Sequence, residues 1–136
     1  MEEKILREIY RKHVKQLKNL NVKHSKLLIC FGGVPGSGKT FISRILEERY
    51  KAVRINSDDI RLIIDEVIKF YHLQKKIKQH LLEEYLFFFL ENYSFFNGLI
   101  IFDSSIDRLY KEIFLVAMEN RFNLFIINLK ASRSEI

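Results

Sequence analysis

The feature that most constrains the fold of this 136-residue chain is a glycine-rich segment between two different apolar patterns. The apolar run 27–31 ends at Gly32 and Gly33, and from Thr40 onward apolar residues recur at spacings of three and four. A compact apolar run is typical of a buried strand, whereas the second spacing is typical of a helix. We therefore expect a strand, a tight glycine-rich turn and a helix in succession.

The same alternation of strand and helix patterns continues along the chain. We predict helices and strands over these ranges: helices at 3–20, 40–50, 60–71, 75–93 and 106–120, and strands at 27–31, 52–56, 99–102 and 122–129. Strands that alternate with long helices are typical of a parallel sheet with right-handed crossovers. We predict an α/β fold with one parallel sheet of about four strands flanked by helices. An N-terminal helix and linker would occupy 1–25, and the main domain 26–136.

Composition and charge limit the classes of protein to which this chain can belong. The chain has 23 basic and 17 acidic residues, a net charge of +6. This balance suits polyanionic partners such as nucleotides, nucleic acid or an acidic metabolite, although codon bias would also produce it. Uninterrupted apolar stretches such as Tyr85–Leu90 are far shorter than the roughly 20 residues of a membrane span, and the charged N-terminus carries no secretion signal. We expect a cytoplasmic protein with no membrane partner.

Cysteine and histidine give little support for metal or redox chemistry. Cys30 is the one cysteine, which excludes an internal disulfide and a cysteine-built metal site. The four histidines show no ligand spacing. We expect Cys30 to be a buried, small apolar residue of the first strand.

The segment Gly33–Thr40 fits the pattern G-x-x-x-x-G-K-[ST] in full. Glycines let several backbone N–H groups face one anion, and the following helix adds its N-terminal dipole. Lys39 can reach the β- and γ-phosphates of a nucleotide, and the Thr40 hydroxyl can ligate Mg²⁺. The pattern predicts a P-loop NTPase with ATP and Mg²⁺ as cofactors; the alternative is a glycine-rich turn without a ligand. The expected nucleotide-binding residues are Gly33, Pro35, Gly36, Ser37, Gly38, Lys39, Thr40 and Phe41.

A second group of polar residues follows the second predicted strand. Asp58 and Arg61 are three residues apart at the start of a helix, so they project toward the same side. The carboxylate can accept the proton of a hydroxyl, and the guanidinium can orient an anionic acceptor. This pair suits phosphoryl transfer, with Lys39, Asp58 and Arg61 as the catalytic set. The alternative is helix capping, with Ser57 or Asp58 as the N-cap residue.

A third acidic group ends the third predicted strand. The run 99–102 is apolar and is followed by Asp103. A carboxylate at this position would lie near the Mg²⁺ that Thr40 is expected to hold. We therefore predict Thr40 and Asp103 as metal-binding residues. The alternative is an acid that stands beside a helix start at Ser104 and Ser105.

Three segments together resemble a known family. "GGVPGSGKTF", "INSDDIR" and "LIIFDSS" are similar to small P-loop kinases often labelled AAA-type ATP-binding proteins. That family includes the kinase domain of polynucleotide kinase and is related to zeta-toxin kinases. The resemblance covers about 27–130 and implies that Asp58 is the general base, that Arg61 contacts the acceptor phosphate, and that Asp103 is the strand-end acid. The family reads D-[AT]-[TS]-[NF] where this chain has Asp103, Ser104, Ser105 and Ile106, so the asparagine is missing.

The resemblance also implies a lid beyond the fourth strand that carries arginines. This chain ends with Ala131–Ile136, and Arg133 comes too early for that role. We therefore expect a chain without the C-terminal lid. Three explanations are open: a truncated product, a lid supplied by another chain, or nucleotide binding without efficient turnover.

We expect an ATP-dependent kinase that transfers the γ-phosphate to a hydroxyl of a nucleic-acid 5′ end or of a small phosphorylated or sugar metabolite. The alternative is a nucleotide-binding module without catalysis; an ATPase that drives a partner's conformational change is a third hypothesis. The sequence leaves the acceptor and the oligomeric state open. The aromatic cluster 85–96 is either core or a base-stacking platform, and the basic N-terminal helix is either a solvated face or an RNA-binding face.

Overall fold

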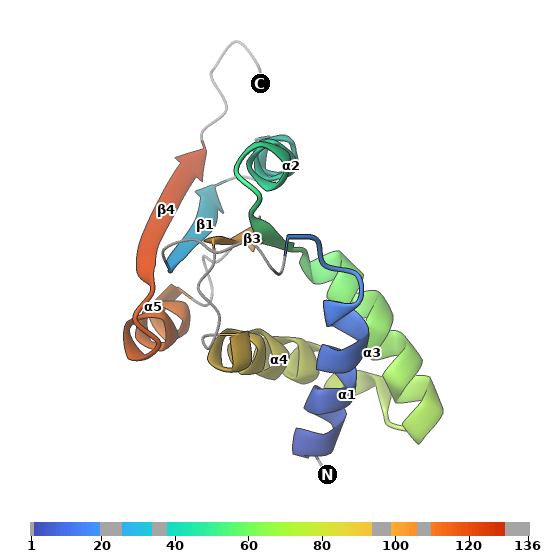
Figure 1. The fold of residues 1–136 in the computed structure, drawn as a ribbon. Coiled ribbons are helices and arrows are strands. Elements are labelled where there is room, and N and C mark those ends of the chain that lie inside the picture. Colours follow the sequence, from blue (N-terminus) through green and yellow to red (C-terminus); the bar gives the residue numbers. More distant parts are fainter. Residues whose placement is uncertain (1, 20–25, 34–37, 94–98, 106–109, 130–136) are drawn as a thin grey trace.

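The computed structural model describes residues 2–19, 26–33, 38–93, 99–105 and 110–129. In chain order the elements are α1 (Glu2–Val14), β1 (Leu27–Gly33), α2 (Lys39–Arg49), β2 (Val53–Ile55), α3 (Ser57–Tyr71), the 3₁₀ turn η1 (Lys75–Ile77), α4 (Lys78–Tyr93), β3 (Leu99–Ser105), α5 (Tyr110–Glu119) and β4 (Asn123–Leu129). The four strands form one parallel sheet in the order β2-β3-β1-β4. The predicted α/β class and four-stranded parallel sheet are confirmed (Figure 1).

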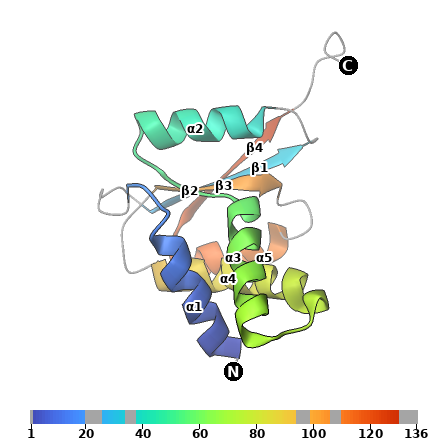
Figure 2. The same cartoon turned by 90° about the vertical axis from the view of Figure 1, so that its right-hand side faces the viewer.

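Helices cover both faces of the sheet unequally. Figure 2 shows α2 over one face and α1, α3, α4 and α5 over the other. The side chains of a strand alternate between faces, so Leu28 and Cys30 of β1 join the larger core under α3 and α4. Ile29 and Phe31 of the same strand join the smaller core with Ile42 of α2. Burial on both faces explains the continuous apolar runs of β1 and of the start of β3, whereas Phe125 and Ile126 of the edge strand β4 are exposed.

The helix α1 ends at Val14, so the predicted helix over 3–20 is too long. Asn19 has a left-handed backbone with a φ of 65°. Its side-chain amide donates hydrogen bonds to the carbonyl oxygens of Glu47 at 3.1 Å and Ala52 at 2.9 Å. These contacts with distant backbone hold the chain in a non-helical conformation, and asparagine tolerates that conformation better than most residues.

The aromatic cluster belongs to the core where the structure describes it. Tyr85 and Phe89 are fully buried, as the core interpretation predicts. Cys30 is also fully buried, and burial raises the pKa of its thiol to about 12. Phe95 and Phe96 lie outside the described residues. No helix in the described part of the chain has the length and apolar character needed to span a membrane.

The strands β1 and β3 extend further than predicted, and this extension positions an acidic residue. The predicted third strand stops at residue 102, whereas β3 continues through Ser105 and includes Asp103. Ile29 pairs with Ile101, but Phe31 pairs with Ser105, so β3 has an irregular stretch between these pairs. Irregularities of this kind redirect side chains next to functional sites. Asp103 therefore lies in the sheet, next to β1, rather than in a following loop.

Candidate nucleotide site

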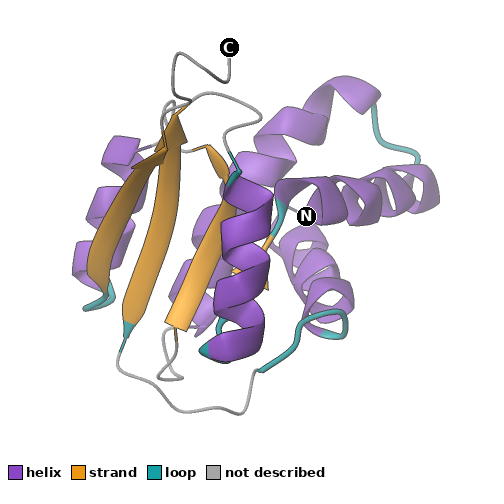
Figure 3. Cartoon of the chain, turned by 90° about the horizontal axis from the view of Figure 1, so that it is seen from above, coloured by secondary structure: helices purple, strands orange, loops and turns teal. Residues whose placement is uncertain are grey.

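The strand β1 and the helix α2 flank the glycine-rich segment, as predicted. Because all strands are parallel, their carboxyl ends lie at one edge of the sheet, which Figure 3 shows from above. Gly33 is the last residue of β1, while Pro35, Gly36 and Ser37 lie outside the described residues. This edge is where open parallel sheets bind ligands.

The N-terminus of α2 has the features of an anion site. Gly38 is the N-cap residue, with a φ of 94° that favours glycine, and no side chain of the described residues caps the helix. The first turn of α2 contains no acidic residue. Lys39 is half-buried and opens the helix, whereas Thr40 and Phe41 are exposed. The uncapped N–H groups of this turn favour a phosphate group.

The Asp103 carboxylate is buried against an arginine that the sequence analysis missed. Arg54 lies in β2, and its Nε donates a hydrogen bond of 2.8 Å to Asp103 Oδ2. Arg54 Nη2 donates to the same oxygen. The exposed fractions of the two side chains are 13% for Arg54 and 1% for Asp103. The pair therefore holds two opposite charges that are largely shielded from water.

The second oxygen of Asp103 has no such partner. Oδ1 is buried and receives no hydrogen bond within the part of the chain that the structure describes. A buried carboxylate oxygen without a partner is costly, and it points to an ion, water or ligand as its partner. This oxygen fits the predicted role of Asp103 toward Mg²⁺.

The ion pair is also connected to α2 and α3. Arg54 Nε donates to Ser43 Oγ at 3.0 Å, and the Ser43 hydroxyl donates to the Thr40 carbonyl oxygen at 3.0 Å. On the other side, Asn56 Nδ2 donates to Asp103 Oδ2 at 3.2 Å. A continuous series of hydrogen bonds thus joins the first turn of α2 with β2, β3 and the start of α3.

The helix α3 begins with a different cap from the predicted one. The alternative, capping interpretation named Ser57 or Asp58 as the N-cap residue, but the N-cap residue is Asn56. Its Oδ1 accepts hydrogen bonds from the N–H groups of Asp58 at 2.8 Å and Asp59 at 3.3 Å. Asn56 has an extended backbone, which brings its side chain back over the first turn. The Asp58 side chain is therefore not needed as a cap.

Asp58 and Arg61 lie on the same side of α3, as their spacing predicts. Arg61 Nη1 donates a hydrogen bond to Asp58 Oδ1 at 2.9 Å. The Asp58 side chain is 85% exposed and the Arg61 side chain 41% exposed. Surface ion pairs of this kind contribute little to stability, so a ligand can displace one partner at small cost.

The sequence analysis missed Arg54 and Ser43, which lie inside a strand and a helix, and Asn56, which is the N-cap of α3. One signal for Arg54 was available: a charged residue flanked by the apolar Val53 and Ile55 in a strand needs a buried partner. The identity of that partner depends on the order β2-β3, which the sequence does not give.

The donors for a metal ion are few among the described residues. The described residues contain no group of three or more His, Cys, Asp or Glu side chains that could hold an ion. Mg²⁺ commonly takes one or two protein ligands together with phosphate oxygens and water. The Thr40 hydroxyl, Asp103 Oδ1 and the phosphates of a nucleotide would together match this coordination preference of Mg²⁺.

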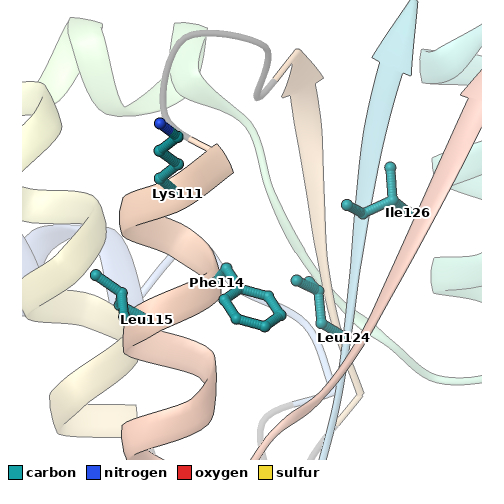
Figure 4. A pocket seen from close by; sticks show the side chains of 5 residues that line it. All are labelled: Lys111, Phe114, Leu115, Leu124 and Ile126. Atoms are coloured by element: carbon teal, nitrogen blue, oxygen red, sulfur yellow. The ribbon is translucent and has the colours of Figure 1, made fainter.

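An apolar pocket lies elsewhere, between α5 and β4. Figure 4 shows its lining, and its volume is about 490 Å³. Its lining residues are Lys111, Phe114, Leu115, Leu124 and Ile126. It offers a single charged side chain and no other polar one, so its chemistry does not suit phosphate groups.

The fold and the site together define a P-loop kinase-like protein: a parallel sheet, a strand-loop-helix phosphate motif and a buried acid on the neighbouring strand. The family model described as zeta toxin matches residues 11–85, more than half of the chain. The chain belongs to the zeta toxin family.

Solved structures share the fold at low sequence identity. A chain from the PezAT chromosomal toxin–antitoxin system of Streptococcus pneumoniae matches with a TM-score of 0.69 and 14% identity, over 99% of this chain and 59% of that one. A putative kinase from Chloroflexus aurantiacus matches with a TM-score of 0.57 and 15% identity, over 79% of this chain and 61% of that one. The chain thus spans about three fifths of the length of these neighbours. No curated protein matches the sequence.

Proposed function

We propose that the chain is an ATP-dependent kinase that transfers the γ-phosphate of ATP to a hydroxyl group. The observation that carries this proposal is the hydrogen-bonded series from Thr40 to Asp103. It joins the N-terminus of α2 to a buried carboxylate, one oxygen of which accepts no hydrogen bond from the described residues. Membership of the zeta toxin family and the kinase-like fold support it. We propose the cytoplasm, where ATP is available, as its location.

The phosphates and the metal ion would be held at the carboxyl edge of the sheet. Lys39 and the N–H groups of the loop would bind the β- and γ-phosphates. Thr40 and Asp103 would hold Mg²⁺, which when bound neutralises charge on the transferring phosphoryl group. The free Oδ1 of Asp103 supports this assignment.

The acceptor would bind at the start of α3. Asp58 would take the proton of the acceptor hydroxyl. The hydroxyl oxygen would bond to the γ-phosphorus while the bond between the γ-phosphorus and the oxygen of ADP breaks. Arg61 would leave its surface ion pair with Asp58 and bind an anionic group of the acceptor. The exposure of both residues supports access from solvent.

The acceptor class is a hydroxyl near negative charge. The negative charge of a nucleic-acid 5′ end or of a small phosphorylated metabolite fits Arg61 and the net charge of +6, whereas a sugar metabolite would supply only the hydroxyl. The alternative function is a nucleotide-binding module that depends on a partner for turnover.

A protein partner is a further element of this proposal. The PezAT neighbour comes from a toxin–antitoxin system, and the chain belongs to the zeta toxin family. We propose that the chain acts as a toxin that a partner protein restrains. A Lys39→Ala variant, which lacks the lysine proposed to bind the phosphates, should then cause less growth arrest than the wild-type chain when expressed.

Label transfer from γ-labelled ATP with Mg²⁺ tests the kinase proposal. The acceptors are a 5′-hydroxyl oligonucleotide and a pool of sugars and nucleosides. Lys39→Ala removes the phosphate ligand, and Asp58→Asn removes the base while keeping its shape. Asp59→Asn is the matched control, because Asp59 is an exposed carboxylate in the same first turn of α3.

Acceptor-dependent label that disappears in Lys39→Ala and falls about 100-fold or more in Asp58→Asn supports the proposal. Asp59→Asn should keep wild-type transfer. Transfer that survives Asp58→Asn unchanged would show that Asp58 is not the base. ATP binding without transfer to any acceptor would favour the nucleotide-binding module.

A further inference from the structure

The Asp103 carboxylate is held unevenly by its neighbours. Oδ2 accepts three hydrogen bonds: from Arg54 Nε, from Arg54 Nη2 and from Asn56 Nδ2. Oδ1 accepts none from the described residues, although it is buried. An arginine that faces a carboxylate commonly binds both oxygens through two parallel hydrogen bonds. Here both N–H groups of Arg54 converge on one oxygen and leave the other free.

Arg54 also contacts the helix that follows the phosphate loop. Its Nε–H is shared between Asp103 Oδ2 and Ser43 Oγ, at 2.8 Å and 3.0 Å. The Ser43 hydroxyl is fully buried and donates to the Thr40 carbonyl oxygen at 3.0 Å. Thr40 and Asp103 are the two residues assigned to Mg²⁺, and Arg54 connects them.

We propose that Arg54 is a positioning residue for the magnesium site. By binding Oδ2 it fixes the orientation of the Asp103 carboxylate, so that Oδ1 is presented to the metal ion or to its bound water. Through Ser43 it fixes the place of β3 relative to the first turn of α2, where Thr40 lies. This inference rests on the proposed function, because it concerns the same nucleotide site.

The chemistry of arginine suits this task. Its guanidinium remains charged at all accessible pH values and has a rigid, planar set of donors. It therefore compensates the buried charge of Asp103 and holds the carboxylate plane at the same time. Asn56 adds a neutral donor to the same oxygen, which strengthens the preference for Oδ2. Groups that orient a metal ligand in this way typically change metal affinity 10- to 100-fold when they are removed.

The test measures Mg²⁺ affinity rather than catalysis. ATP binding is measured by calorimetry, first with a chelator and then over a series of Mg²⁺ concentrations. The variants are Arg54→Met, Arg54→Lys and Ser43→Ala. Arg44→Met is the matched control, because Arg44 is an exposed arginine of α2 next to Ser43. Circular dichroism and thermal unfolding check that each variant is folded.

Arg54→Met should weaken Mg²⁺ binding to the ATP complex about 10- to 100-fold, while Mg²⁺-free ATP binding changes by less than about threefold. Arg54→Lys should recover part of the loss, because lysine keeps the charge but lacks the planar donors. Ser43→Ala should give a smaller loss, and Arg44→Met none.

Unchanged Mg²⁺ affinity in Arg54→Met, or an equal fall in ATP affinity with and without Mg²⁺, would show a merely structural ion pair. If Arg54→Met does not fold, the test uses the Mg²⁺ affinities of Arg54→Lys and Ser43→Ala. Wild-type Mg²⁺ affinity in both variants would overturn the proposal. A wild-type protein that fails to bind ATP at all would instead overturn the proposed function. A Mg²⁺ response in the wild type that every variant keeps would overturn only the role of Arg54.

Discussion

His13 should make the stability of this protein depend on pH in the mildly acidic range. The side chain is 1% exposed, and its Nδ1 lies 2.7 Å from the hydroxyl oxygen of Tyr85. The rings of Tyr85 and Phe89 pack edge-on against the imidazole. Burial in this apolar setting lowers the pKa of His13 from 6.5 to about 4.

The sign and the size of the effect follow from this shift. Because the pKa is lower in the folded state, the unfolded state binds more protons between about pH 6.5 and pH 4. The stabilisation by neutral His13 is therefore fully present above pH 6.5 and is lost as the pH falls toward 4. At about 1.4 kcal/mol for each pKa unit, the full loss is roughly 3 kcal/mol, and about 2 kcal/mol of it should occur between pH 7.5 and pH 5. The total free energy of unfolding of a small domain is about 5–15 kcal/mol, so a change of this size is measurable.

Urea unfolding at a series of pH values tests this prediction. The free energy of unfolding of the wild type should fall more steeply below pH 6.5 than that of His13→Leu, which cannot titrate. A difference between wild type and His13→Leu that stays constant from pH 7.5 to pH 5 would refute the reasoning.

Three further predictions concern other parts of the fold. Asn56→Ala should lower the free energy of unfolding by about 1 kcal/mol or more, because α3 loses its cap and Asp103 a donor; a value near zero in urea unfolding would contradict the cap assignment. Cys30 should react with a thiol reagent only as the protein unfolds, because its thiol is buried and its pKa is raised to about 12; rapid labelling in native buffer would argue against this. Phe125→Thr should reduce concentration-dependent light scattering with little effect on stability, because Phe125 is 62% exposed on the edge strand β4; unchanged scattering would exclude that surface as the cause.

The strand-helix alternation and the phosphate motif could be predicted from sequence because both depend on local patterns. The apolar run before Gly33 and the helical spacing after Thr40 are short-range signals, and the structure has a strand and a helix at these places. Helix ends were less predictable: α1 ends at Val14, and the segment after it is held at Asn19 by hydrogen bonds to Glu47 and Ala52, more than 25 residues away. The N-cap of α3 could not be predicted either. Asn56, Ser57 and Asp58 all have suitable side chains, and only the backbone conformation selects Asn56 among them.

The Arg54–Asp103 pair shows why part of the site could not be predicted. The two residues are 49 positions apart and meet because β2 lies beside β3 in the sheet. The sequence predicts Asp103 as a metal ligand from its place after an apolar run, but a carboxylate has two oxygens, and the neighbouring residues determine which one is left for a ligand. In this fold Arg54 and Asn56 both bind Oδ2, so the oxygen left for a ligand is determined by residues of another strand and of a helix cap. A motif therefore predicts which residue faces the nucleotide, whereas the packing of neighbouring strands determines how that residue is presented.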